Sequence, residues 1–209
     1  MEKENMTTDT TGVETSLPEF VPWRGHVSSE MQEHTGRRES TASELRWYDP
    51  AVVPGLLQTR DYAREILTVG LGAAGDDDDV EAALTARLAR QQRWRVSTVG
   101  THFLIAEQAL YTSVGDAGTM SAQLEMLLRP LPDTARLGVL PRTSYFHTAA
   151  TNFIIFGASE VVVETVTGSL RLPGEPDIAD YTAVFDELAA HAAYGTSADA
   201  LIRQAIAAA

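Results

Sequence analysis

Residues 53–64 read VPGLLQTRDYAR, and this stretch determines how the rest of the chain is interpreted. Proline fixes φ and glycine adopts backbone conformations that other residues avoid, so Pro54-Gly55 predicts a turn. Apolar residues then recur at spacings that place them on one face of a helix: Leu56, Leu57, Tyr62 and Ile66. Gln58 lies four residues before Tyr62, so their polar tips share a neighbouring stripe. The stretch predicts a tight turn that leads into an amphipathic helix over about residues 59–69, with the leucines in the core.

Four short apolar segments have the length and composition of strands: 102–106, 136–140, 153–157 and 161–165. The first two are joined through helical segments, which favours a crossover connection and a parallel pair. The last two are separated by Gly157-Ala158-Ser159-Glu160, which predicts a hairpin. Residues 169–172 are a candidate for one further strand. We expect helices to cover one face of this sheet.

Helical patterns account for most of the remaining chain: about 26–48, with a break or kink at Thr35-Gly36, then 79–95, 108–114, 120–128, 177–194 and 198–207. Asp78 and Asp79 end an acidic loop and are expected to cap the helix that follows. Ser197 is the expected cap of the last helix. The fold class predicted is α+β: a single domain with a small mixed sheet covered by helices. Residues 1–18 are polar and acidic and predict a disordered tail, which leaves 19–209 as the domain.

Composition limits the classes of protein that need consideration. The chain has 209 residues, enough for one domain with a sizeable core. It has no cysteine, so disulfides, thiolate metal sites and cysteine nucleophiles are excluded. Apolar runs fall short of the roughly 20 residues that a membrane span needs, and the first residues lack the pattern of a signal peptide. The expected location is the cytoplasm, with no membrane partner.

The charge balance argues against direct binding to nucleic acid. The net charge is −13, from 29 acidic and 16 basic residues. Phosphate contacts from lysine and arginine dominate affinity for duplex DNA. Basic residues gather in only two places, Arg37-Arg38 and the segment 87–95. We therefore expect no sequence-specific binding to DNA.

Several motifs together carry a resemblance to a known family: PGLLQT-x-x-YA at 54–63, ARLARQ at 86–91 and VVVE at 161–164. They resemble a bacterial domain-of-unknown-function family that lies C-terminal to an Xre-type helix-turn-helix in Scr-type, antitoxin-like transcriptional regulators. The resemblance covers about residues 40–205. The chain departs from the family pattern at Tyr145, where a small residue is usual, and at Thr41, where an acid is common. Residues 1–25 are too few to form the helix-turn-helix domain, so we expect the C-terminal regulatory domain of such a regulator without its DNA-binding domain.

The resemblance implies a regulatory domain that binds a small molecule or a small protein partner encoded nearby. Candidate ligand-binding residues lie in and around the motifs: Trp47, Tyr48, Gln58, Tyr62, Arg87, Arg90, Gln91 and Gln123. An arginine cluster in so acidic a chain is either a solvated helix face, an anion site or the partner of buried carboxylates. We predict that Arg87 or Arg90 forms an ion pair with Glu107 or Glu164 at the wall of the main cavity.

No complete catalytic signature is present, and no P-loop, G-x-G-x-x-G or H-E-x-x-H motif occurs. A candidate constellation consists of Glu107 and Glu164 at strand ends and His147 on a loop. Together with Trp47, Tyr48 and Tyr62, these side chains could form a pocket that binds a small molecule or moves protons on one. The candidate catalytic residues are Glu107, His147 and Glu164.

His26, Glu30 and His34 are spaced four residues apart, so on a helix they could share one face and ligate a metal. The segment lacks a zinc-protease pattern, and a solvated helix stripe accounts for the spacing, so neither metal nor cofactor is predicted.

Three hypotheses remain open: a ligand- or partner-binding regulatory domain, a freestanding acid–base enzyme (an isomerase or cyclase of specialised metabolism), and a dimerisation module that forms a homodimer.

Overall fold

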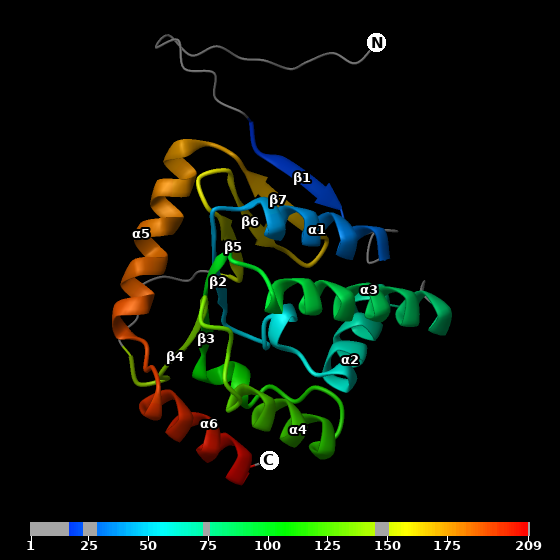
Figure 1. The fold of residues 1–209 in the computed structure, drawn as a ribbon, viewed down its shortest axis with the longest axis vertical. Helices are drawn as coiled ribbons and strands as arrows, with labels where there is room; N and C mark the ends of the chain where they lie inside the picture. The colour runs from blue at the N-terminus through cyan, green and yellow to red at the C-terminus, as the bar shows by residue number, and fades with distance from the viewer. Residues whose placement is uncertain (1–16, 23–28, 73–75, 145–150, 209) are drawn as a thin grey trace.

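One mixed sheet of seven strands runs through the part of the chain described by the computed structural model, which covers residues 17–22, 29–72, 76–144 and 151–208 (Figure 1). The strand order is β1-β7-β6-β5-β2-β3-β4. Strands β2, β3 and β4 are parallel, and the other neighbouring pairs are antiparallel. The strands are β1 (Glu19–Pro22), β2 (Glu44–Asp49), β3 (Gly100–Ala106), β4 (Ala135–Leu140), β5 (Phe153–Phe156), β6 (Glu160–Glu164) and β7 (Gly168–Leu172).

The sequence predictions of a parallel β3–β4 pair and a β5–β6 hairpin are confirmed. Phe103 is opposite Leu137 in the parallel pair, and Phe153 is opposite Val163 in the hairpin. Gly157 has a φ of 55°, in the left-handed region that favours glycine, so it closes the hairpin turn without strain. The expected α+β class with one mixed sheet is therefore correct.

The central strand β2 corrects the prediction of a helix over residues 26–48. The helix α1 (Ser29–Thr41) ends before residue 44, where β2 begins, and β2 pairs with both β3 and β5. Leu45 and Tyr48 are three residues apart, which fits a helical face, but they pack into different clusters on opposite faces of the sheet. Polar and apolar residues alternate only over the first four positions of β2, and the next two, Tyr48 and Asp49, are both buried, so the period of the strand is short in the sequence.

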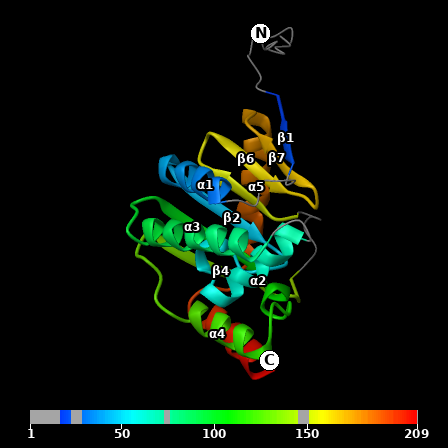
Figure 2. The ribbon, with the colours of Figure 1, turned by 90° about the vertical axis from the view of Figure 1, so that its right-hand side faces the viewer.

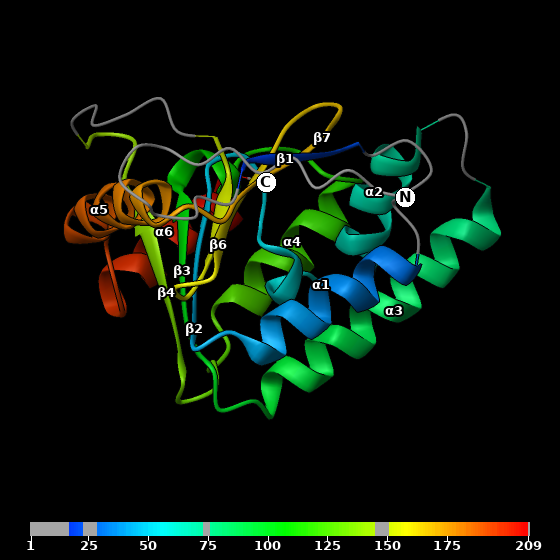
Figure 3. The same ribbon diagram turned by 90° about the horizontal axis from the view of Figure 1, so that it is seen from above.

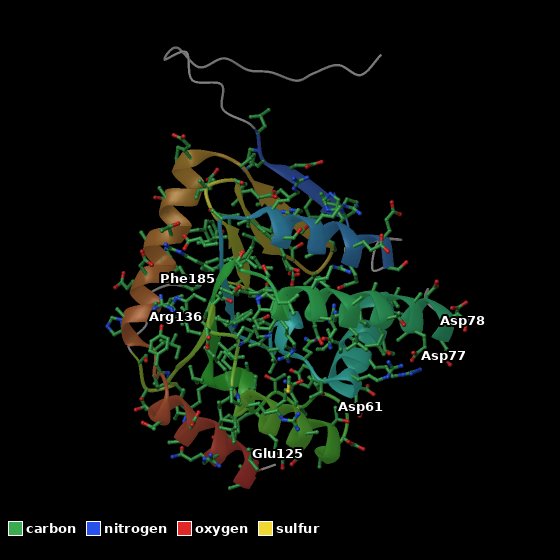
Figure 4. The ribbon with its side chains drawn as sticks, viewed as in Figure 1. Asp61, Asp77, Asp78, Glu125, Arg136 and Phe185 are labelled. Carbon is green, nitrogen blue, oxygen red and sulfur yellow. The ribbon has the colours of Figure 1, made fainter. Side chains whose placement is uncertain are left out.

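Helices cover both faces of the sheet, where one covered face was expected (Figures 1 and 3). On one side lie α1, α2 (Arg60–Leu71), α3 (Asp77–Arg95) and α4 (Ala117–Leu127), while α5 (Glu175–His191) packs on the other. The last helix, α6 (Thr196–Ala208), packs against β4 and α4. Phe185 is fully buried and points from α5 toward the sheet (Figure 4). The short antiparallel strands are apolar on both faces, so α5 is needed to bury the second face.

Two predictions, a kink at Gly36 in α1 and the cap of α3, differ in detail from the structure. Gly36 lies inside α1, where a kink was expected, and a Cβ atom there would meet Arg93 Nη2 at 3.0 Å and Arg90 Cγ at 3.2 Å. The glycine thus permits close approach of the two helices, which lie one above the other in Figure 2. The N-cap of α3 is Asp76, which accepts a hydrogen bond from the Asp79 N–H (2.9 Å). The expected Asp79 completes the capping box by accepting the Asp76 N–H (3.5 Å), while Asp78 lies in the first turn.

The motif of residues 54–59 is held by three glutamine side chains. It forms a 3₁₀ turn, η1 (Gly55–Leu57), followed by α2, which Thr59 caps. Gln58 Nε2 donates to the Val53 carbonyl (2.8 Å), and Gln91 Nε2 donates to the carbonyls of Gly55 (2.8 Å) and Gln58 (2.9 Å). Gln123 Nε2 donates to the Leu57 carbonyl (2.9 Å), and its Oε1 accepts from Thr59 N–H (2.7 Å). Because a buried unpaired backbone group is costly, these amides fix the turn in the core.

Candidate functional site

A cavity of about 470 Å³ lies between one face of the sheet and the elements α1, η1, α2 and α3. Its apolar wall comes mainly from the sheet and the start of the motif, and includes Trp47, Val53, Ile154, Phe156 and Val162. Its charged and polar lining comes from both layers, and includes Gln58, Arg87, Arg90, Arg38, Arg171, Asp49 and Glu164. This size and mixture of surfaces are typical of a small-molecule site.

Arg87 reaches the cavity from α3 and is held by two amide side chains. Its Nη1 donates to Gln58 Oε1 (2.7 Å), and its Nε donates to Gln32 Oε1 (3.4 Å). Burial lowers the pKa of Arg87 to about 9, with neighbouring Arg90 acting in the same direction, and Glu164 and Glu39 opposing them. The side chain remains protonated at neutral pH. A glutamine of the motif therefore orients a cationic group at the cavity wall.

Arg90 pairs with Glu39 of α1, which corrects the prediction of a partner at Glu107 or Glu164. The distance between Arg90 Nε and Glu39 Oε2 is 3.3 Å, and both side chains are nearly buried. Arg90 Nη1 also donates to Gln32 Oε1 (2.8 Å). Burial raises the pKa of Glu39 above its usual value, while Arg90 opposes that shift. Among the ion pairs of the described residues, none joins Arg87 or Arg90 to Glu107 or Glu164.

A second ion-pair network closes the side of the cavity formed by β1, β6 and β7. Buried Glu160 accepts hydrogen bonds from Arg38 Nε (2.7 Å) and Arg171 Nε (2.9 Å). Arg171 Nη1 also lies 2.9 Å from Glu19 Oε2. The guanidinium of Arg38 lies over the ring of Phe156, 4.5 Å from its centroid. The network connects α1 to β1, the strand nearest the N-terminus.

Trp47 and Asp49 project from the same face of β2 into the cavity lining, since alternate residues of a strand share a face. Asp49 Oδ1 accepts the N–H groups of Ala51 and Val52, both at 3.1 Å. Burial nevertheless raises the pKa of Asp49 to about 7, with a smaller contribution from Glu164. The Nε1 atom of Trp47 is buried and has no hydrogen-bond partner in the described structure. The sequence did not single out Asp49, which follows directly after the helix expected over residues 26–48. On the strand β2, its place two residues after Trp47 puts both side chains on one face.

Comparison with known families supports the sequence resemblance at the level of the domain. Residues 32–204 match the model of a family described as "Domain of unknown function (DUF5753)". The chain belongs to the DUF5753 family. Among curated proteins, no relative matches it.

Solved structures similar to this DUF5753 domain include three that each align with 86% of the chain. They are NucT from Helicobacter pylori (7% identity, 98% of that chain, TM-score 0.40), the phospholipase D family member Nuc from Salmonella typhimurium (11%, 96%, 0.43), and the archaeal chromatin protein TrmBL2, which shows a novel mode of DNA binding (12%, 55%, 0.38). These similarities are too distant to inform function.

The three candidate catalytic residues are not brought together. Glu164 is exposed, lines the cavity and accepts a hydrogen bond from Asn152 Nδ2. Glu107 lies outside the cavity lining; its Oε2 accepts the Arg142 backbone N–H (2.9 Å), and Arg142 Nε is 3.6 Å from Oε1. His147 lies outside the described residues.

The eight candidate ligand-binding residues divide into two groups. Trp47, Gln58, Arg87 and Arg90 line the cavity. Tyr48, Tyr62, Gln91 and Gln123 do not: Tyr48 packs in the cluster beneath α5, Tyr62 is fully buried and its hydroxyl accepts from Val53 N–H, and the two glutamines hold the motif. The motif residues thus serve the fold more than the cavity.

The described part of the chain contains no cluster of three or more histidine or acidic residues arranged to hold a metal. Glu30 and His34 line the cavity, whereas His26 lies outside the described residues. Partial burial, followed by neighbouring Arg38, lowers the pKa of His34 below its usual value. The arginines around His34 therefore disfavour the binding of a metal cation there. None of the helices described is long and apolar enough to cross a membrane.

Proposed function

We propose that this DUF5753 domain binds a small molecule in the cavity between its sheet and the α1–α3 pair, and acts as a regulatory sensor. The observation that carries the proposal is a cavity of about 470 Å³ with two unsatisfied groups in its wall. Among the described residues, Arg87 pairs with no carboxylate, and the buried indole N–H of Trp47 has no acceptor. Leaving a buried donor unpaired costs about 1–3 kcal/mol, and a bound ligand could supply the missing acceptors.

The regulatory part of the proposal rests on the position of β1. Glu19 and Val21 of this strand line the cavity, and Glu19 is tied to the Arg171–Glu160–Arg38 network. A ligand can shift an equilibrium only through contacts that differ between two states. Contact with β1 would let a ligand act on the N-terminal segment. In the Scr-type regulators that the sequence resembles, that side of the domain leads to an Xre-type helix-turn-helix.

Native mass spectrometry of protein purified from its natural host tests this function. Val162 lines the cavity, so Val162→Phe should place a larger side chain in it and obstruct the ligand; Val166, which is 98% exposed, provides the matched control Val166→Phe. We expect the wild type and Val166→Phe to carry a bound molecule that Val162→Phe, folded by circular dichroism, has lost. Equal retention of that molecule by Val162→Phe, or no bound molecule on the wild type, would contradict the proposal.

The alternative, an acid–base enzyme, is favoured by one observation: a carboxyl in the cavity, Asp49, whose pKa of about 7 suits proton transfer near neutral pH. This enzyme would use Asp49 in place of the expected Glu107–His147–Glu164 set. Incubating small-molecule extract of the host with wild type and with Asp49→Asn separates the two functions. Consumption of a compound by the wild type alone would support the enzyme, and binding by both proteins without turnover would support the sensor.

A further inference from the structure

Arg87 differs from the other cavity arginines in its partners. Arg38 and Arg171 share Glu160, and Arg90 pairs with Glu39. Arg37 is exposed. Within the described residues Arg87 has no ion pair and donates only to two neutral amide oxygens, through Nε and Nη1. Its Nη2 group makes no hydrogen bond there, so a charged donor at the cavity wall is free to bind an acceptor.

The backbone of the motif is shaped to let the arginines approach it. A Cβ atom at Gly55 would lie 2.8 Å from Arg90 Nη2, 3.8 Å from the Trp47 ring and 3.9 Å from Arg87 Cζ. A Cβ atom there would therefore require Arg90 Nη2 to shift, whereas Trp47 and Arg87 would lie at ordinary van der Waals distance. Gln58, itself bonded to the Val53 carbonyl, fixes Arg87 Nη1. The guanidinium is held in place before any ligand arrives, which reduces the entropy lost on binding.

The remaining lining limits what else a ligand can carry. Asp49 and Glu164 also line the cavity, so a second negative group on the ligand would meet carboxyl groups. Asp49 Oδ2 receives no hydrogen bond from the described residues and can accept one from a neutral hydroxyl or amine. Trp47, Ile154 and Phe156 supply a broad apolar surface. These surfaces fit a molecule with one acidic group and an aromatic or apolar body.

We propose that the cavity selects a small organic monoanion, with its carboxylate or sulfonate on Arg87 and its apolar body against Trp47, Ile154 and Phe156. The inference rests on the proposed function and specifies its ligand class. Charge-assisted hydrogen bonds from a guanidinium are about twice as strong as neutral ones and are often bidentate, so Arg87 provides most of the selection for the acid.

Fluorescence titration with two dyes tests this selection. 8-Anilinonaphthalene-1-sulfonate carries one sulfonate on an aromatic frame, and N-phenyl-1-naphthylamine has the same frame without it. We expect the wild type to bind the sulfonate at least about 10-fold more tightly than the neutral dye. Arg87→Gln should weaken sulfonate binding by about 10- to 100-fold and leave the neutral dye nearly unchanged. Arg87→Lys should retain part of the preference, and Arg203→Gln, on the exposed face of α6, should behave as wild type.

Each other outcome is decisive. If the wild type binds neither dye, the cavity does not bind ligands and the proposed function fails with it. If the wild type binds the neutral dye as tightly as the sulfonate, the monoanion inference fails and the proposed function stands. If folded Arg87→Gln binds both dyes as wild type does, or loses both equally, Arg87 does not recognise the acid. Should Arg87→Gln not fold, the dye preference of the wild type and of Arg87→Lys still decides the inference.

Discussion

At the scale of single residues, Asp49 combines two opposing environments. Two backbone N–H groups stabilise its carboxylate, while burial and Glu164 disfavour it, and burial dominates. The carboxyl keeps its proton in the folded protein to about pH 7, compared with a pKa of 3.8 for the unperturbed group. The folded state thus binds a proton that the unfolded chain has already released. Because the carboxyl ionises in the unfolded chain while it stays protonated in the folded protein, stability falls as the pH rises from about 4 to about 7.

Asp49→Asn should remove this pH dependence, because asparagine keeps an oxygen for Ala51 and Val52 and does not titrate. We expect the free energy of unfolding of wild type, relative to Asp49→Asn, to fall by up to about 4 kcal/mol between pH 4 and 7 and to stay level above pH 7. Urea denaturation at a series of pH values measures the difference. Asp180→Asn, at an exposed position of α5, is the control. A constant difference between wild type and Asp49→Asn would contradict the account.

Gln123 was expected from sequence to bind a ligand, but its side chain instead bonds the backbone of Leu57 and Thr59. Gln123→Ala leaves the Thr59 N–H and the Leu57 carbonyl without partners in the core. We expect a loss of about 3 kcal/mol in the free energy of unfolding. Gln204→Ala, exposed on α6, should change it by less than about 0.5 kcal/mol. A Gln123→Ala protein as stable as wild type would show that the motif does not depend on this amide.

At the scale of elements, local patterns predicted the hairpin and the parallel pair, because turn residues and apolar runs report directly on neighbouring segments. They did not predict β2, in which the alternation that marks a strand extends over only four residues. Nor did they predict the Arg90–Glu39 pair or the role of Gly36, since both depend on α1 packing against α3. Three of the cavity residues found from sequence, Gln58, Arg87 and Arg90, lie in the motifs. Arg38 and Arg171 were missed because only the packing of α1 and β7 around the cavity brings them to its wall.

Strand β1 provides the test at this scale. If the cavity is the binding site, a ligand should reduce the opening of the strand that lines it. We expect 8-anilinonaphthalene-1-sulfonate to slow amide hydrogen exchange in residues 19–22 and 168–171 and to leave α6 unchanged. Hydrogen-exchange mass spectrometry measures both regions in one experiment. Slowed exchange in α6 with none in β1 would place the dye elsewhere.

At the scale of the whole molecule, the charge of −13 sets an expectation about nucleic acid. Most cavity arginines are already paired with carboxylates and are not available to phosphates. We expect this chain to show no sequence-selective binding to duplex DNA at about 0.15 M salt. Gel-shift assays with a random-sequence library measure this. Sub-micromolar, sequence-selective binding would show that the chain has a surface that recognises DNA sequence despite its net negative charge.

If the cavity beside Trp47 is the ligand site, the indole N–H groups of Trp47 and Trp94 should respond differently to a ligand. Trp94 Nε1 already donates to Thr101 Oγ1 (3.0 Å), whereas Trp47 Nε1 has no partner in the described structure. The measurement is a proton–nitrogen NMR titration with 8-anilinonaphthalene-1-sulfonate, with Trp47→Phe used to assign the signal. We predict that the Trp47 indole resonance moves in step with dye occupancy while the Trp94 resonance stays in place. A saturated protein in which the Trp47 resonance has not moved would contradict the account.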